Sequence, residues 1–214
     1  MNAQVTGQTQ AVRFESPRLI EPEDQVRADY YALLANLFYR APDARLLQAM
    51  VISAEPLGDS PNPLSKAWAD LAAASGVVTA DAVEDEYQSL FIGVGRPPVM
   101  LYGSFYLAGF MNEKPLAELR GSLSRLGYAR DSNATEPEDH LAALCDVMRA
   151  MILGDVSHAP ASIDAQREFF VRHMQPWVLK CCAAITENEK ANYYMRVAAF
   201  ACAFFEIEIQ AFEM

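Results

Sequence analysis

Val197-Ala-Ala-Phe-Ala-Cys-Ala-Phe-Phe205 is apolar at every position and lies inside the longer helical segment 189–212. A helix that is apolar on all sides cannot rest on the surface of a soluble protein, because each of its faces has to be covered by another element. The nine residues therefore predict a helix buried in the middle of a helical bundle. The segments that precede it in the chain must supply the cover.

Those preceding segments carry apolar residues at helical spacing. Val26, Tyr30, Leu33, Leu34 and Leu37 recur at i, i+4, i+7, i+8 and i+11, which is one stripe of a helix beginning near residues 23–24. Similar patterns or helix start signals predict further helices at 43–53, 64–75, 79–93, 115–126, 136–154, 162–173 and from 176 onward. A strand is conceivable in the aromatic and glycine-rich 99–110, but the sequence offers it no partner strand. We expect a flexible tail over 1–22 and one all-α domain of about nine or ten helices over 23–214.

Charge and hydropathy limit the kinds of partner. The chain has 17 Lys and Arg against 28 Asp and Glu, a net charge of -11, which disfavours binding to nucleic acid or to an anionic membrane surface. A basic ligand suits it better. The longest stretch without charged residues is the sixteen residues 97–112, interrupted by proline and glycine, so we expect no stable membrane insertion. The N-terminus lacks the features of a secretory signal, and we expect a cytoplasmic protein.

Known catalytic and metal-binding patterns are missing from the sequence. The four cysteines, Cys145, Cys181, Cys182 and Cys202, have neither the spacing of a metal site nor the density of a disulfide scaffold, and we expect them to be reduced and structural. Three histidines are too few for a dinuclear carboxylate site with two Glu-x-x-His helices. No nucleophile motif is present. We therefore expect no catalytic residues, no bound metal and no cofactor.

Glu136-Pro-Glu-Asp-His140 is the sharpest cluster of polar residues, and it has two explanations. Thr135 and Glu138 match a capping box, Pro137 suits a first helical turn, and the carboxylates favour the positive end of a helix. Capping leaves His140 unexplained, because Glu136 and His140 at i, i+4 would share one helix face beside Asp139. That face could present a carboxylate and an imidazole to a cationic ligand.

Six ordered motifs between Tyr87 and Trp177 resemble the TorD/DmsD/NarJ family of cytoplasmic chaperones for molybdenum redox enzymes. The motifs are Tyr87-x-x-Leu90-Phe91-x-Gly93, Gly95-Arg96, Tyr102-Gly-Ser104-x-Tyr106-Leu107, Pro115-Leu116-x-x-Leu119-Arg120, Glu136-Pro-Glu-Asp-His140 and Phe169-Phe170 followed by His173-x-x-Pro176-Trp177. The resemblance implies an all-helical, TorD-like fold and no catalytic step. It also implies binding of the twin-arginine signal peptide and of the apo form of a molybdopterin-containing subunit, with export held back until the cofactor is inserted.

The resemblance also implies which residues bind the peptide. They are Tyr87, Leu90, Phe91, Tyr102, Gly103, Ser104, Tyr106, Pro137, Asp139 and His140, with Glu136, Arg120 and Trp177 in support. A signal peptide contains an arginine pair and an apolar segment. Acidic groups can bind the arginines, and exposed aromatic rings beside them can contact both the arginines and the apolar segment. One departure is Leu101, where many members of the family have proline. Helical spacing alone makes Tyr87, Leu90 and Phe91 ordinary core residues instead.

Two alternatives from other classes stay open on the sequence. One is a nucleotide-binding or hydrolysing regulator that uses the loop from Gly93 to Pro98, although this loop lacks the lysine and the preceding strand of a phosphate-binding motif. The other is a helical scaffold with an acidic surface. The client enzyme and the oligomeric state, monomer or domain-exchanged dimer, are not readable from the sequence.

Overall fold

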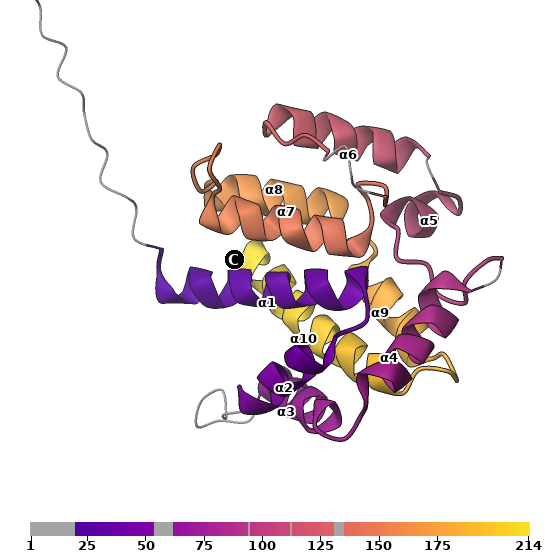
Figure 1. Cartoon of the computed structure of the whole chain (residues 1–214). Coiled ribbons are helices and arrows are strands. Elements are labelled where there is room, and N and C mark those ends of the chain that lie inside the picture. Colours follow the sequence, from indigo (N-terminus) through magenta and orange to yellow (C-terminus); the bar gives the residue numbers. More distant parts are fainter. Residues whose placement is uncertain (1–19, 54–61, 94, 112, 131–134) are drawn as a thin grey trace, which may run out of the picture.

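The computed structural model describes residues 20–53, 62–93, 95–111, 113–130 and 135–214. Within them the chain forms ten α-helices and one π-helix, and no β-strand (Figure 1). This confirms the all-α prediction. The elements are α1 Pro22–Tyr39, α2 Ala44–Ile52, α3 Pro63–Ser75, α4 Ala80–Tyr87, the π-helix η1 Gln88–Ile92, α5 Gly103–Ala108, α6 Lys114–Arg125, α7 Leu141–Leu153, α8 Ile163–His173, α9 Val178–Thr186 and α10 Tyr193–Glu213. Most of the proposed tail 1–22 lies outside the described residues.

Helix α10 runs through the middle of the molecule, with α3, α4, α8, α9 and α1 around it (Figure 1). Val197, Phe200, Ala201 and Phe205 on it have no exposed surface. The prediction of a central helix at 197–205 is confirmed. The helix begins at Tyr193 and not at residue 189, because residues 188–191 form a turn in which the Ala191 N–H donates to the Asn188 carbonyl at 2.9 Å.

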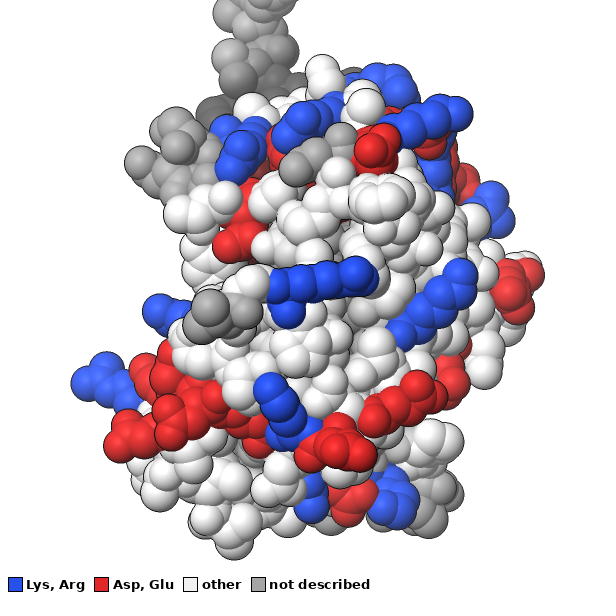
Figure 2. Space-filling view, turned by 90° about the vertical axis from the view of Figure 1, so that its right-hand side faces the viewer, with Lys and Arg blue, Asp and Glu red and all other residues white. Residues whose placement is uncertain are grey.

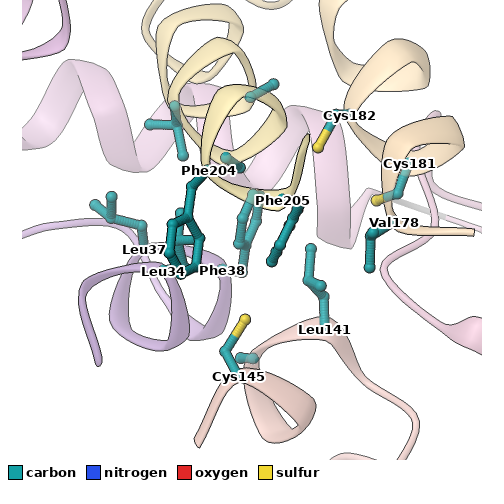
Figure 3. Close-up of a cluster of buried hydrophobic side chains, with 14 of the residues drawn as sticks. Leu34, Leu37, Phe38, Leu141, Cys145, Val178, Cys181, Cys182, Phe204 and Phe205 are labelled. Atoms are coloured by element: carbon teal, nitrogen blue, oxygen red, sulfur yellow. The ribbon is translucent and has the colours of Figure 1, made fainter. Parts of the chain in front are cut away.

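Helices α1 and α7 pack along one another and close one side of the core. Figure 3 shows Leu34, Leu37 and Phe38 of α1 around the same space as Phe204 and Phe205 of α10, with residues of α7 and α9 completing the cluster. Cys145, Cys181 and Cys182 are among these buried side chains, and burial raises the pKa of each thiol. All four cysteines are free, as the sequence predicts.

One ion pair is enclosed by the packed helices. Glu208 of α10 is 1% exposed, and its carboxylate accepts two hydrogen bonds of 2.8 Å from Arg27 and one of 2.9 Å from the Tyr31 hydroxyl. Two charge-assisted bonds to one guanidinium are the geometry in which a buried carboxylate is best compensated. The contact fixes α1 against α10.

Several helices begin next to a capping residue that is recognisable in the sequence. The side chains of Asp43, Asn62, Thr79 and Ser162 each accept a hydrogen bond from a backbone N–H three residues later. The predicted start of α7 is wrong. The helix begins at Leu141 instead of near residue 136, so Thr135 and Glu138 do not form a capping box and Glu136 and His140 do not share a helix face.

The segment before α7 is held out of the helix by tertiary hydrogen bonds. The Leu141 N–H donates to the Leu101 carbonyl at 2.8 Å, and the Gly103 N–H donates to the Asp139 carbonyl at 2.9 Å. Tyr102 and His140 thus form an isolated antiparallel bridge. No described helix is long and apolar enough to cross a membrane.

Candidate functional site

The segment 136–140 forms a turn whose outer side is fixed to α6. The His140 N–H donates to the Pro137 carbonyl at 3.1 Å, which closes the turn. Arg120 of α6 donates to both carboxylate oxygens of Glu138, at 3.0 and 2.9 Å, and this hydrogen-bonded guanidinium lowers the pKa of Glu138. Such a paired contact defines orientation as well as distance. Arg120 therefore supports the turn from outside.

Asp139 fixes the inner side of the same turn. Its side chain is 4% exposed, and one carboxylate oxygen accepts a hydrogen bond of 2.7 Å from the Ser104 N–H in the first turn of α5. The other oxygen, Oδ1, and the Ser104 hydroxyl are buried without a hydrogen-bond partner in the described structure. The carboxylate thus faces the interior. A direct contact between Asp139 and a peptide stays a prediction, and the observed geometry favours an indirect role.

His140 caps α7 with its ring. The Nδ1 atom accepts a hydrogen bond of 3.1 Å from the Ala142 N–H, so the hydrogen of the neutral ring lies on Nε2. Burial lowers the pKa of His140 to about 4, and the nearby carboxylates of Glu136 and Asp139 only partly oppose this effect. At neutral pH the ring is uncharged. It can donate one hydrogen bond to an acceptor such as a peptide carbonyl.

Glu136 and Tyr102 meet across the bridge between the two segments. The Tyr102 hydroxyl donates to Glu136 Oε2, and the Tyr102 ring lies edge-on to the His140 ring with centroids 5.0 Å apart. Burial, followed by this bond to a carboxylate, raises the pKa of Tyr102. Among the described residues, the other oxygen of Glu136 accepts no hydrogen bond.

Tyr87 connects α4 to the end of α1. Its hydroxyl donates to the carbonyls of Phe38 and Tyr39 at 3.2 and 2.8 Å, and burial raises its pKa. The π-helix η1 follows directly and ends where the Gly93 N–H donates to the Gln88 carbonyl at 2.8 Å. Gly93 has a φ of 53°, a conformation that glycine adopts without strain. Single π turns inside helices are frequent at functional sites.

Two clefts meet at Tyr39, Glu136 and His140. We call them the α1/α7 cleft, of about 480 Å³, and the α4 cleft, of about 300 Å³. The α1/α7 cleft is lined by Ala32, Ala35, Asn36, Tyr39, Glu136, His140, Ala142, Ala143, Asp146 and Arg149. The α4 cleft is lined by Tyr39, Arg40, Glu84, Tyr87, Gln88, Phe91, Ile92, Leu101, Tyr102, Thr135, Glu136 and His140.

The structure brings five of the thirteen sequence-predicted site residues together at these clefts. Tyr87, Phe91, Tyr102, Glu136 and His140 line the α4 cleft. The others lie behind it or beside it. Leu90 is fully buried, Gly103, Ser104 and Asp139 are buried beneath the bridge, Tyr106 stacks on the buried Trp177, Pro137 lies within the turn, and Arg120 holds Glu138. Their assignment to peptide binding stays a prediction.

Sequence analysis missed the contribution of α1. Tyr39 is 53% exposed at the end of this helix and borders both clefts, next to a row of small residues on α1 and α7. The only signal in the sequence is an aromatic residue placed beyond the apolar stripe of 26–37, which marks it as a residue outside the core. Glu84 and Gln88, which share a hydrogen bond of 2.7 Å, were likewise not singled out.

The charges are unevenly distributed over this side of the molecule. Figure 2 shows acidic side chains in a band across its lower half, at the height of α4 in Figure 1. Basic side chains gather at the top, at the height of α6.

No group of three or more potential metal ligands occurs among the described residues. In the loop after η1, Arg96 lies over the Phe105 ring at 4.9 Å, and the loop follows a π-helix and not a strand.

Comparisons with known proteins agree with this architecture. Residues 58–183 match the family model described as nitrate reductase delta subunit. The chain is 25% identical to the chaperone protein TorD of Vibrio parahaemolyticus over 130 residues, which cover 58% of this chain and 60% of that protein. It is 23% identical to TorD of Shewanella loihica over 214 residues, covering 89% and 94% of the two chains. The chain thus spans less than two thirds of the length of some of the relatives it matches.

A solved structure shares the fold. A protein of Archaeoglobus fulgidus described as a redox enzyme maturation protein superposes with a TM-score of 0.58 over 92% of this chain and 99% of that one, at 18% identity. At that identity the likeness concerns the fold alone. The family model, by contrast, matches more than half of the 214 residues. With the all-helical fold of the described residues, this match establishes that the chain belongs to the nitrate reductase delta subunit family, that of the TorD/DmsD/NarJ chaperones.

Proposed function

We propose that this protein is a cytoplasmic maturation chaperone that binds the twin-arginine signal peptide and the apo form of a molybdopterin-containing oxidoreductase subunit. It would aid cofactor insertion and hold back export, without a catalytic step of its own. The observation that carries the proposal is the meeting of two unlike clefts at Tyr39, Glu136 and His140. A signal peptide likewise has two unlike halves, one cationic and one apolar.

The α4 cleft suits the cationic half. Its lining contains the carboxylates of Glu84 and Glu136 among the rings of Tyr39, Tyr87 and Tyr102. A guanidinium can form hydrogen bonds with carboxylates and stack on aromatic faces at the same time. Arg40 lies in the same lining, so the cleft is acidic by one charge and not by two. We therefore expect it to hold one arginine of the pair tightly.

The α1/α7 cleft suits the apolar half. Four alanines line it, two from α1 and two from α7, and small side chains let another segment approach the two helices closely. His140 lines both clefts, and its Nε2–H can donate to a carbonyl of the bound backbone. Binding then combines apolar burial, which salt does not weaken, with charge attraction, which salt screens.

The test is a titration of the full chain with a signal peptide containing an arginine pair. Glu136→Gln and Glu84→Gln are expected to weaken binding by about tenfold each, because each removes a carboxylate from a partly enclosed charge-assisted contact. Asp85→Asn is the matched control, since Asp85 is an exposed acid of α4 outside the cleft lining. A peptide with two lysines should bind more weakly to the parent. Equal affinity of all three variants for the arginine peptide would contradict the proposal.

Asp139→Asn tests whether Asp139 contacts the peptide directly or only stabilises the turn 136–140. Because its carboxylate accepts the Ser104 N–H inside the protein, we expect this variant to lower stability by about 1–2 kcal/mol. Its effect on peptide affinity should be smaller than that of Glu136→Gln at a temperature where both variants are folded. Strong loss of affinity without loss of stability would instead make Asp139 a direct contact.

A further inference from the structure

A third cleft, between α6 and α8, is separate from the two peptide clefts and shares no lining residue with them. Its volume of about 220 Å³ is below that of typical ligand pockets, so it can enclose only a small group and not a peptide segment. Two arginines border it, Arg125 of α6 and Arg172 of α8, and an apolar side is formed by Leu126 and Phe169. Its inner residues are Ser122 and His173.

Ser122 and His173 form a hydrogen-bonded pair at the base of this cleft. The Ser122 hydroxyl lies 2.8 Å from His173 Nε2, and these residues are 6% and 7% exposed. Arg125 also donates to the Ser122 hydroxyl, at 3.0 Å. Burial lowers the pKa of His173 to about 4, and the charge of Arg172 acts in the same direction. The base is therefore polar and uncharged at neutral pH, below two cationic groups.

Between them, the two guanidinium groups at the rim form one long ion pair with a described carboxylate. Arg125 forms no ion pair with a carboxylate in the described parts of the chain, and its only hydrogen bond there goes to the Ser122 hydroxyl. Arg172 reaches Glu118 at 3.9 Å, beyond hydrogen-bond distance. Glu168 also lines the cleft but pairs with neither arginine within the described residues. With Arg125, Arg172 and Glu168, the lining of the cleft has a formal charge of 2 − 1 = +1.

We propose that the α6/α8 cleft binds the phosphate group of a small phosphate monoester, with its organic part against Leu126 and Phe169. Two guanidinium groups offer the forked donors that match phosphate oxygens, and the hydroxyl of Ser122 gives a further polar contact below them. An apolar wall next to the cations favours an ester over the free ion, because it can cover an organic group. The proposal uses no residue of the peptide clefts.

Calorimetric titration with inorganic phosphate and with phenyl phosphate tests the proposal, with sodium chloride keeping the ionic strength constant. The parent should bind one equivalent of each ligand, and phenyl phosphate should bind more tightly. Arg125→Gln and Arg172→Gln should each weaken binding by about tenfold or more, the equivalent of losing one charge-assisted contact. Both side chains are on the surface, and melting temperatures verify that the variants are folded.

Arg167→Gln is the matched control. Arg167 belongs to α8, is 54% exposed and pairs with Asp164 at 3.4 Å, but it does not line the cleft. This variant should bind both ligands as the parent does. The proposal is overturned if the parent shows no saturable binding at millimolar ligand, or if all three arginine variants lose affinity equally. Tighter binding of inorganic phosphate than of phenyl phosphate would overturn the choice of an ester.

Discussion

The Glu86 carboxylate on α4 accepts a hydrogen bond of 2.8 Å from the Tyr194 N–H at the start of α10, 108 positions later in the sequence. The same carboxylate accepts the N–H groups of Asn192 and Tyr193, at 2.8 and 3.0 Å. The first turn of a helix leaves such N–H groups without partners, and a negative charge there also complements the helix dipole. A single side chain thus caps the central helix and fixes α4, which contributes Tyr87 to the α4 cleft.

Glu86→Gln is expected to lower the free energy of unfolding by about 1–2 kcal/mol, the range for losing a charged helix cap. Urea denaturation followed by circular dichroism measures the change. Asp85→Asn, one residue earlier and exposed, removes the same charge without a cap and should change stability by less than about 0.5 kcal/mol. Equal effects of the two substitutions would show that only the overall charge matters.

Gly103→Ala is expected to destabilise the protein by about 1–3 kcal/mol through overpacking. A Cβ atom at Gly103 would lie 3.0 Å from Nε1 of Trp177 and 3.1 Å from its Cε2. Trp177 is buried and its Nε1 donates to the His173 carbonyl at 2.7 Å, so the ring cannot easily move away. Trp fluorescence should shift as well.

Gly121→Ala is the control for that substitution. Gly121 is an exposed residue of α6 whose added Cβ would meet only the end of the Arg125 side chain, at 3.8 Å. Alanine is favoured over glycine inside a helix by about 0.5–1 kcal/mol. This variant should therefore be slightly more stable than the parent, and destabilisation by both alanines would refute the steric argument.

Glu208→Gln is expected to cost up to about 3–5 kcal/mol, because the partly buried Arg27 guanidinium then keeps only Asp24, whose side chain is 44% exposed, as a carboxylate partner. The double substitution Arg27→Met with Glu208→Met should recover part of that loss, since it removes both charges together. Chemical denaturation of the single and double variants measures the coupling. Additive losses would mean that the two residues act independently despite their hydrogen bonds of 2.8 Å.

Stability should fall as the pH decreases from 7 toward 5. The pKa values of His140 and His173 are lowered to about 4 in the folded protein, so between pH 6.5 and 4 the unfolded chain binds more protons than the folded one. The stabilisation is present above the unfolded pKa of about 6.5 and is lost below it. For His140 the loss by pH 5 is up to about 2 kcal/mol.

Denaturation at pH 5, 6 and 7 measures this dependence. His140→Gln and His173→Gln should each reduce the slope of unfolding free energy against pH, whatever they do to stability at pH 7. A slope that stays the same in both variants would assign the pH dependence to the carboxylates.

The helical fold and its central element were predictable from the amino-acid sequence. The apolar run 197–205 required cover on all sides, and the stripes on the other segments supplied it. Local helix caps are also predictable from the sequence, as at Asp43 and Ser162, because the donor and the acceptor lie three residues apart. Motif resemblance placed Tyr87, Tyr102, Glu136 and His140 in one functional region, and the structure places all four at one cleft.

The start of α7 and the set of residues that line the clefts depend on long-range packing. Residues 139–141 pair with residues 101–103, so their backbone groups form hydrogen bonds across this bridge and not within a helix. As a result, α7 begins at Leu141 and not at residue 136. This pairing turns Asp139 inward and makes His140 the cap. Tyr39 joins the site only because α1 packs along α7. Contacts between residues about 40 to 100 positions apart depend on how whole helices pack. Helical periodicity shows which face of a helix is apolar, but it does not show which helix packs against that face.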